Sequence, residues 1–87
     1  QQARGEYIMY HVYIIQSLNF PDRFYTGYTE DVIKRLRSHN HGQDNYTNKY
    51  KPWEIKTIIT FNNKQRALNF ERYLKSPSGR AFAKKRL

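Results

Sequence analysis

Apolar residues run almost without interruption through residues 10–17, and most of them are β-branched or aromatic. This pattern predicts a strand that is covered on both faces. Turn-forming residues follow, and the run at 23–28 predicts a second strand that pairs with the first as an antiparallel hairpin. A third strand is expected over 53–61, where the apolar residues favour one face.

The pattern changes to helical spacing over residues 30–40, where apolar residues form a short stripe. Thr29 can cap this predicted helix. Glu30 and Asp31 would then lie in its first turn, where the helix dipole favours negative charge. Gly42 is suited to the left-handed backbone that ends many helices.

Two further helices are predicted near the C-terminus. One covers 64–75 and is capped by Asn62 or Asn63, and the other covers 80–86 with a cap near Ser78. Each has apolar residues on one side, so each is expected to pack on the sheet.

The polar stretch at 43–51 is predicted to be a loop. The elements therefore follow the order β-β-α-β-α-α, an α+β fold in which helices flank a small three-stranded antiparallel sheet. With 87 residues the chain is expected to form one domain, over 10–87. The preceding residues, 1–9, are expected to be an N-terminal extension of native or non-native origin.

Sixteen lysines and arginines stand against seven acidic residues, which gives a net charge of +9. This balance indicates a polyanionic partner, either nucleic acid or an anionic membrane surface. The chain contains no cysteine, which excludes disulfides and thiolate metal sites. A reducing, intracellular setting is natural for such a chain, and we expect a cytoplasmic protein.

A membrane partner is the less favoured interpretation. No apolar run is long enough to cross a bilayer. The basic C-terminal tail has only Phe82 and Leu87 as large apolar anchors, too few for an interfacial helix. We therefore expect a nucleic acid, most readily DNA, as the partner. A protein that targets the chain is a further expected partner, and the oligomeric state stays open.

Arg35 and His39 lie four residues apart on the predicted helix, so their side chains project from one side. Arginine binds phosphate through its planar fork, and histidine moves protons near neutral pH. The alternative is a solvated basic face, because Lys34 and Arg37 flank the pair. The pattern alone leaves both interpretations open.

Tyr13, Tyr25 and Tyr28 lie on the two strands of the predicted hairpin. All three can be ordinary aromatic residues of a small core, and for Tyr28 we adopt that interpretation. If Tyr13 and Tyr25 point to the edge where Arg35 emerges, their hydroxyls can orient a water near a phosphate. A tyrosine that serves as a base needs a lowered pKa, which a nearby cation can provide. Gly27 is expected to close the second strand in a tight turn.

Glu71 falls on the same side of its predicted helix as Ala67 and Leu74. A carboxylate on an apolar face is costly without a partner. It can pair with Lys75 one turn later, or it can hold a metal ion. A hard oxygen donor suits Mg²⁺, which uses one or two carboxylates and keeps several waters. No other acid lies on such a face, so we do not expect a metal cage built only of protein ligands.

In this order the residues resemble the GIY-YIG nuclease family. His11-Val12-Tyr13 stands where the family has its first triplet, and Tyr25-Thr26-Gly27 where it has its second. Arg35 and His39 match the family's arginine and its histidine or tyrosine on the following helix. Glu71 matches the family's metal-binding glutamate.

The resemblance covers residues 10–87 and is strongest to small single-domain bacterial members, of the URI type and similar to UPF0213 proteins. The matching segments are Arg35 to Asn40, Pro52-Trp53-Glu54, Phe70-Glu71 and Lys75 to Phe82. Catalytic subunits of structure-selective endonucleases share the Pro-Trp and Phe-Glu features. Two departures stand out: the first triplet lacks glycine and isoleucine, and Tyr28 replaces a lysine of the excision-repair members.

The resemblance implies a divalent-metal-dependent endonuclease that hydrolyses DNA phosphodiester bonds in repair or recombination, with structure selectivity or weak sequence selectivity. Glu71 would hold one ion, Mg²⁺ or Mn²⁺, and Arg35 would neutralise charge on the phosphate. Tyr13 would activate the attacking water, His39 would take the proton on, and Tyr25 would hold the water or a phosphate oxygen.

The remaining basic residues are expected to bind the phosphate backbone without reading bases. Tyr46 and Tyr50 of the polar stretch could stack on unpaired bases. The rival function is a non-catalytic or partner-dependent nucleic-acid-binding module on the same fold. The predicted backbone-binding residues are Lys34, Arg37, Lys49, Lys51, Lys64, Arg72, Lys75, Arg80, Lys84 and Lys85.

Overall fold

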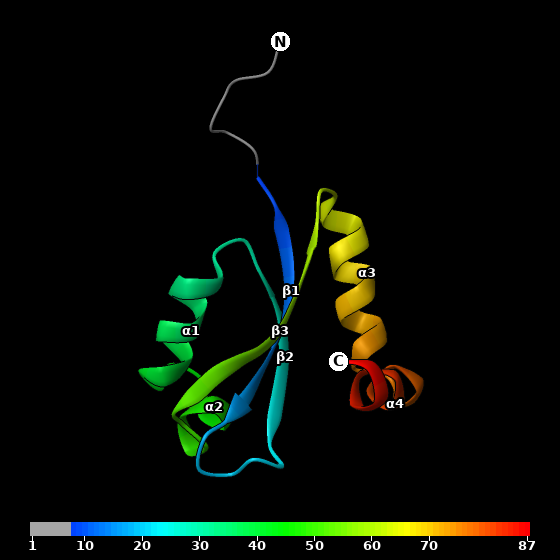
Figure 1. Cartoon of the computed structure of the whole chain (residues 1–87). Helices are drawn as coiled ribbons and strands as arrows, with labels where there is room; N and C mark the ends of the chain where they lie inside the picture. The colour runs from blue at the N-terminus through cyan, green and yellow to red at the C-terminus, as the bar shows by residue number, and fades with distance from the viewer. Residues whose placement is uncertain (1–7) are drawn as a thin grey trace.

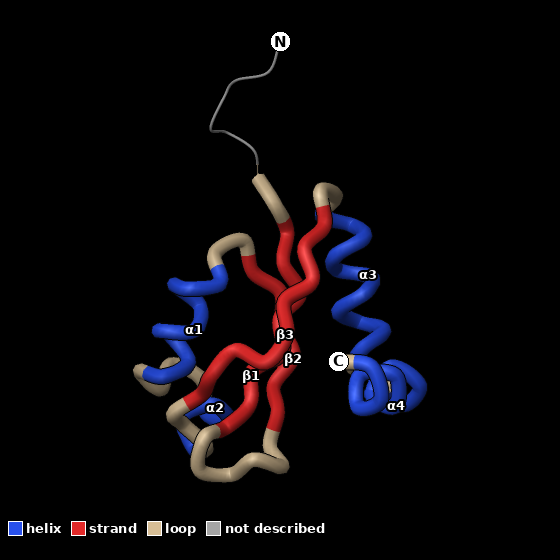
Figure 2. Tube along the Cα trace, viewed as in Figure 1, coloured by secondary structure: helices blue, strands red, loops and turns tan. Residues whose placement is uncertain are grey.

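The computed structural model describes residues 8–87, a three-stranded sheet with helices on both sides (Figures 1 and 2). The extension expected at 1–9 therefore lies, apart from its last two residues, outside the described residues. The elements in chain order are β1 (Tyr10–Ser17), β2 (Phe24–Thr29), α1 (Val32–Asn40), α2 (Asn45–Lys49), β3 (Trp53–Phe61), α3 (Lys64–Leu74) and α4 (Pro77–Arg86).

The sheet is antiparallel throughout, and its strands lie in the order β2-β1-β3. β1 and β2 form the predicted hairpin, in which Tyr13 faces Gly27. β1 also pairs with β3, where Tyr13 faces Ile58, and the register shifts between Ile14 and Ile15. The middle of β1 is buried, so the prediction of a strand covered on both faces is confirmed.

Helices α1 and α2 cover one face of the sheet, and α3 and α4 cover the other (Figure 1). Because successive side chains of a strand point to opposite faces, β1 contributes to two separate cores. Val12 and Ile14 pack against α3 in one core. Tyr13 and Ile15 pack with Trp53 in the other. The sheet thus separates the core under α3 from the core that surrounds Tyr13.

α1 begins two residues later than the sequence predicts. Asp31 is the N-cap, and its carboxylate accepts a hydrogen bond from the Lys34 backbone N–H. The Thr29 hydroxyl accepts from the Asp31 N–H instead, ahead of the helix. Glu30 and Asp31 are therefore not in the first turn, and that prediction is wrong. Gly42 has a φ of 78°, as expected for a residue that ends a helix.

α4 begins three residues earlier than predicted because Ser76, and not Ser78, is its N-cap. Pro77 follows the cap, and proline is favoured at the first helical position. Gly79 lets α4 approach the end of α3 closely: a β-carbon on residue 79 would lie 2.7 Å from the Leu74 α-carbon. α3 begins where predicted, with Asn63 as its cap.

The predicted loop at 43–51 contains a short helix, α2, which adds one element to the predicted order. Asp44 caps it by accepting hydrogen bonds from the backbone N–H groups of Tyr46 and Thr47. The indole of the buried Trp53 donates to the Thr47 carbonyl at 2.8 Å. The segment is therefore fastened to the sheet.

Candidate active site

Arg35, Tyr13 and His39 form a hydrogen-bonded chain between β1 and α1. The Tyr13 hydroxyl oxygen lies 2.8 Å from His39 Nε2, and Arg35 Nε donates to the same oxygen at 3.3 Å. Residues 35 and 39 are one helical turn apart, so both side chains project from the same side of α1 and reach Tyr13. The structure thus brings together three residues that the sequence assigns to one site.

Chemistry fixes the direction of one of these bonds: arginine has no acceptor, so Arg35 donates to the Tyr13 oxygen. The direction of the other bond depends on the tautomer of His39. With the ring proton on Nδ1, which is buried and has no hydrogen-bond partner among residues 8–87, the Tyr13 hydroxyl donates to Nε2. Burial, and secondarily the charge of Arg35, lowers the pKa of His39 to about 4. His39 is therefore neutral at pH 7, and in the tautomer protonated on Nδ1 its Nε2 can accept a proton.

Tyr13 is a neutral phenol. Its side chain is 2% exposed, and this burial raises its pKa to about 12, although the hydrogen bond and the charge of Arg35 act in the opposite direction. The expected lowering of the pKa by a nearby cation is thus outweighed by lost solvation. Tyr13 can relay a proton from one neighbour to another, but it does not carry a standing negative charge.

Gly27 lies within β2, which continues to Thr29, and not in a turn as the sequence predicts. Its φ is not positive, so the backbone conformation does not require glycine. Packing does: a β-carbon on residue 27 would lie 2.6 Å from Cζ of the Tyr13 ring. Glycine is needed at this position because the ring of Tyr13 lies directly over it.

The ring of Tyr25 lies beside both His39 and Tyr13. Their ring centroids are 4.8 Å apart in an edge-to-face arrangement, and the Tyr25 and Tyr13 rings are 6.3 Å apart. Tyr46 of α2 packs on Tyr25 at 6.3 Å. Because Tyr25 is partly exposed whereas Tyr13 and His39 are buried, it lies between the buried hydrogen-bonded chain and solvent.

Glu71 projects from α3 and pairs with Lys75, with 3.1 Å between Oε2 and Nζ. The surface pair that the sequence offers as one interpretation is therefore present. It does not exclude the other interpretation, because the Glu71 side chain is still 21% exposed. Lys75, the partner of Glu71, has its Nζ 5.8 Å from the centroid of the Tyr25 ring, which relates the carboxylate to the site.

The carboxylate of Glu71 alone is compatible with a hydrated magnesium or manganese ion. Within residues 8–87, no three side chains of His, Cys, Asp or Glu gather closely enough to hold an ion. A single accessible carboxylate suits Mg²⁺, which keeps several waters and is commonly completed by substrate phosphates. It does not suit Zn²⁺, which takes three or four protein ligands. Lys75 competes with the ion for the same carboxylate.

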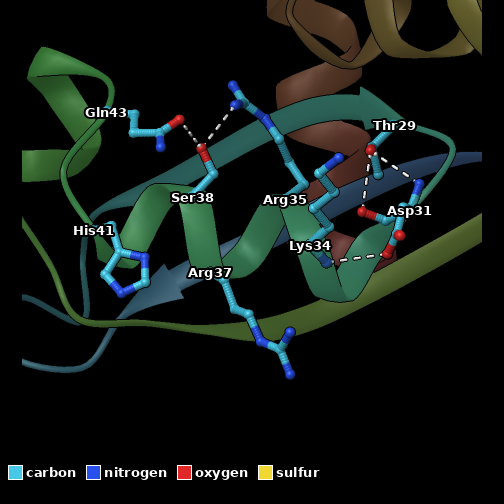
Figure 3. A pocket seen from close by; sticks show the side chains of 8 residues that line it. All are labelled: Thr29, Asp31, Lys34, Arg35, Arg37, Ser38, His41 and Gln43. Atoms are coloured by element: carbon cyan, nitrogen blue, oxygen red, sulfur yellow. Dashed lines mark hydrogen bonds between the residues drawn. The ribbon is translucent and has the colours of Figure 1, made fainter.

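Beside α1 lies a shallow pocket of about 530 Å³ that includes Arg35 (Figure 3). Arg35 Nη1 donates to the Ser38 hydroxyl at 3.4 Å, and this hydroxyl donates to Gln43 Oε1 at 2.7 Å. The sequence does not single out Ser38 and Gln43, although the i, i+3 spacing from Arg35 is a weak signal for the former. In Figure 3, Lys34 points to the same side of α1 as Arg35, whereas Arg37 points to the opposite side.

All the predicted backbone-binding residues are exposed, but they do not form one surface. Arg37 points away from Arg35, whereas Lys75, Arg80 and Lys84 line a common groove beside α4. Exposure permits contact with a polyanion, so their role stays a prediction, as does the cytoplasmic location. No helix in the described part of the chain combines the length and apolar character needed to cross a bilayer.

Known proteins resemble this chain in sequence. Residues 9–86 match the model of the GIY-YIG catalytic domain. The structure-specific endonuclease subunit SLX1 of Debaryomyces hansenii is 37% identical over 75 residues, which cover 78% of this chain and 22% of that protein. SLX1 of Meyerozyma guilliermondii is 39% identical, over 78% of this chain and 25% of its own length. The chain thus spans about a quarter or less of these fungal relatives.

Smaller relatives match over most of their length. A UPF0213 protein of Halobacterium salinarum is 35% identical over 71 residues, which cover 80% of this chain and 90% of that protein. The solution NMR structure of a UPF0213 protein from Bacillus halodurans is similar in fold, with a TM-score of 0.54 and 27% identity. The match covers 90% of this chain and 84% of that one.

Proposed function

The chain belongs to the family of GIY-YIG catalytic domains, and from this premise we propose that it is a divalent-metal-dependent endonuclease that hydrolyses DNA phosphodiester bonds. The observation that carries the proposal is the hydrogen-bonded chain from Arg35 through Tyr13 to His39. One hydroxyl joins a cation that can bind phosphate to an imidazole that can accept a proton. Such an arrangement serves general-base activation of water next to a phosphate.

The first role of the chain is proton movement. The attacking water transfers a proton to the Tyr13 oxygen while the Tyr13 hydroxyl proton moves to His39 Nε2. The raised pKa of Tyr13 suits this exchange because the phenol is neutral before and after it. His39 begins neutral and ends as an imidazolium, which its buried position makes a strong acid. The imidazolium returns its proton to the Tyr13 oxygen while the Tyr13 hydroxyl proton passes to the departing oxygen, which resets the site for another cycle.

The second role is stabilisation of the phosphate. Arg35 stays protonated, and its guanidinium can neutralise the charge that develops on the phosphate oxygens as the water oxygen bonds to phosphorus and the leaving oxygen departs. The bond from Nε to the Tyr13 oxygen fixes the cation relative to the group that activates the water. A Mg²⁺ or Mn²⁺ ion held by Glu71 would supply stabilisation of charge on the departing oxygen.

We further propose that the substrate is recognised by its shape, in DNA repair or recombination. The fungal relatives are named structure-specific endonuclease subunits, which supports shape selectivity and, through the word subunit, a partner protein that targets the chain. The described residues form one small α+β unit, and its candidate site is directed at the phosphate backbone of the nucleic acid. Contacts to the phosphate backbone do not distinguish one base sequence from another.

The test is cleavage of an end-labelled set of single-stranded, duplex, flapped and four-way-branched DNA, with a matching RNA. Parent protein is compared with Glu71→Gln and with Glu54→Gln, an exposed carboxylate on β3, in Mg²⁺ and in chelator. We expect Mg²⁺-dependent cutting of branched DNA that is lost in Glu71→Gln and kept in Glu54→Gln. DNA binding without cutting by the parent protein would instead indicate the rival, a binding module.

A further inference from the structure

A groove of about 850 Å³ lies at the edge strand β2, lined by α2 on one side of the sheet and by α4 and the end of α3 on the other. We call it the α4 groove. Phe24, Tyr25 and Tyr46 contribute aromatic side chains to it. Lys75, Arg80 and Lys84 contribute cations from the end of α3 and from α4. Of these six residues, Phe24 is the one to which neither the sequence analysis nor the candidate active site assigns a role.

The aromatic rings of the groove are available to a ligand. Phe24 is 43% exposed and Tyr46 38% exposed, although both are large side chains that a core of this size would be expected to bury. Tyr46 and Tyr25 are tilted by only 32° at 6.3 Å between centroids, so their faces form a stepped surface. Exposed aromatic rings such as those of Phe24 and Tyr46 are suited to stacking on flat ligands such as nucleobases.

Cations accompany the rings. Lys75 Nζ lies 5.8 Å from the centroid of Tyr25, and Lys56 Nζ lies 5.8 Å from the centroid of Phe24. Arg80 Nε donates to the Lys75 carbonyl at 3.2 Å, which fixes the arginine at the groove wall. Asp22 is the one acid that lines the groove, so the net charge there is positive. Stacking surfaces beside cations match the alternation of bases and phosphates along a nucleic-acid strand.

The occupant must be a single strand. Bases of a duplex are stacked on one another and do not offer their faces to protein rings. The groove volume also falls within the range of about 300–1000 Å³ typical of small-ligand sites, which can hold a short piece of one strand but cannot enclose a duplex. Tyr25 belongs both to this groove and to the surroundings of His39, so a strand in the groove leads directly to the candidate active site.

We propose that the α4 groove binds an unpaired DNA strand next to the scissile phosphate, and that Phe24 is its stacking residue. The consequence for cutting rests on the proposed nuclease function, whereas the binding itself does not. The groove thus gives a physical basis for shape selectivity: a flap or branch can place an unpaired strand there, and an intact duplex cannot.

The experiment measures the anisotropy of a fluorescein-labelled oligothymidylate and of a labelled duplex of equal length, with the full chain in chelator so that neither is cut. Phe24→Ala and Phe24→Leu are compared with Tyr73→Ala, an exposed ring on α3 outside the groove. We expect both Phe24 variants to weaken oligothymidylate binding about tenfold, with duplex binding unchanged within about twofold. Tyr73→Ala should leave both affinities near those of the parent protein.

Variants that remove charge from the groove provide a second test of the proposal. Arg80→Gln with Lys84→Gln should lower the salt dependence of oligothymidylate binding by about 1.4 in the log–log slope, since each lost phosphate contact removes about 0.7. Arg66→Gln with Arg86→Gln, exposed cations that neither line the groove nor belong to the predicted backbone-binding set, should change that slope less. Circular dichroism and thermal unfolding establish that each variant is folded.

Three results would overturn the proposal: Phe24 variants that bind the oligothymidylate as the parent protein does, equal weakening of single-strand and duplex binding, or tighter binding of the matching RNA than of DNA. Cleavage assays on the same proteins separate the two proposals. If the parent protein cuts no substrate and Phe24→Ala weakens single-strand binding, the groove proposal is supported and the nuclease proposal is contradicted. If the parent protein cuts DNA with metal and Phe24→Ala does not change binding, the nuclease proposal is supported and the groove proposal is contradicted.

Discussion

The Tyr13 hydroxyl and His39 Nε2 lie 2.8 Å apart, and both side chains are almost completely buried. Each group provides the hydrogen-bond partner that the other needs when it is buried, because buried polar groups are destabilising without a partner. The pair therefore has a structural role in addition to the catalytic one proposed for it. Experiments on the site must separate loss of chemistry from loss of stability.

Tyr13→Phe removes the hydroxyl that joins Arg35 to His39 and keeps the ring. We expect the cleavage rate to fall by about 100- to 10,000-fold, as is typical when general acid–base chemistry is lost. The unpaired His39 nitrogen should cost about 1–3 kcal/mol of unfolding free energy. Tyr10→Phe is the control, because Tyr10 packs on Tyr28 against the other core. Single-turnover cleavage and urea unfolding measure the two effects, and an unchanged cleavage rate would exclude the proton relay.

Gly27→Ala places a methyl group against the Tyr13 ring. We expect a loss of about 1–3 kcal/mol of unfolding free energy, as for other overpacked sites, together with loss of cleavage as the tyrosine is displaced. In a Tyr13→Ala background the same substitution should cost at least about 1 kcal/mol less, since the colliding ring is gone. Urea unfolding of the four proteins gives this coupling. Additive effects would show that Gly27 has another function in β2.

Stability should depend on pH through His39. Its pKa is about 4 in the folded chain, against 6.5 for an ordinary histidine, so the unfolded chain binds more protons between these values. The contribution of neutral His39 to the free energy of unfolding should therefore be complete above pH 6.5. Below pH 6.5 the free energy of unfolding should fall as the pH drops toward 4, by up to about 1.4 kcal/mol per pH unit. His39→Gln should flatten this part of the profile, and His41→Gln, on the surface, should not. Parallel profiles for parent and His39→Gln would refute the assignment.

Gly79→Ala tests the close contact between α4 and the end of α3. The added methyl group would meet backbone atoms of Tyr73 and Leu74, which cannot rotate away as a side chain can. We expect destabilisation of about 1–3 kcal/mol, whereas Ser78→Ala, at the exposed neighbouring position, should stay within about 0.5 kcal/mol. Thermal unfolding of the three proteins measures the difference. A Gly79→Ala protein as stable as the parent would mean that α4 can shift on α3 without cost.

The parts of the fold that follow from the sequence are those with a repeating pattern. The continuous apolar run predicts the central strand β1, and the helical stripe with its asparagine cap predicts α3. α2 escapes prediction because a helix of five residues has no period to detect. The start of α1 is misplaced because Thr29 and Asp31 are both good caps, and only the backbone conformation decides between them.

The sequence predicts which residues form the site, but it does not predict their pKa values or how tightly they pack. Spacing on one helix brings Arg35 and His39 together, and hairpin pairing brings Tyr13 to them. The raised pKa of Tyr13 depends on how completely the whole fold buries it, which no local pattern expresses. Gly27 is misread for the same reason: the ring that requires a glycine there comes from a different strand.

The order of the site residues along the chain has a consequence for how the site is assembled. Tyr13 and His39 are separated by 26 positions, and Tyr13 and Arg35 by 22, whereas Glu71 follows only after β3 has returned to pair with β1. Closing a shorter loop costs less chain entropy, and contacts between nearby residues form faster. We therefore expect the groups that move the proton to come together early in folding and the carboxylate to join them last, so that the two halves of the site are separated in time.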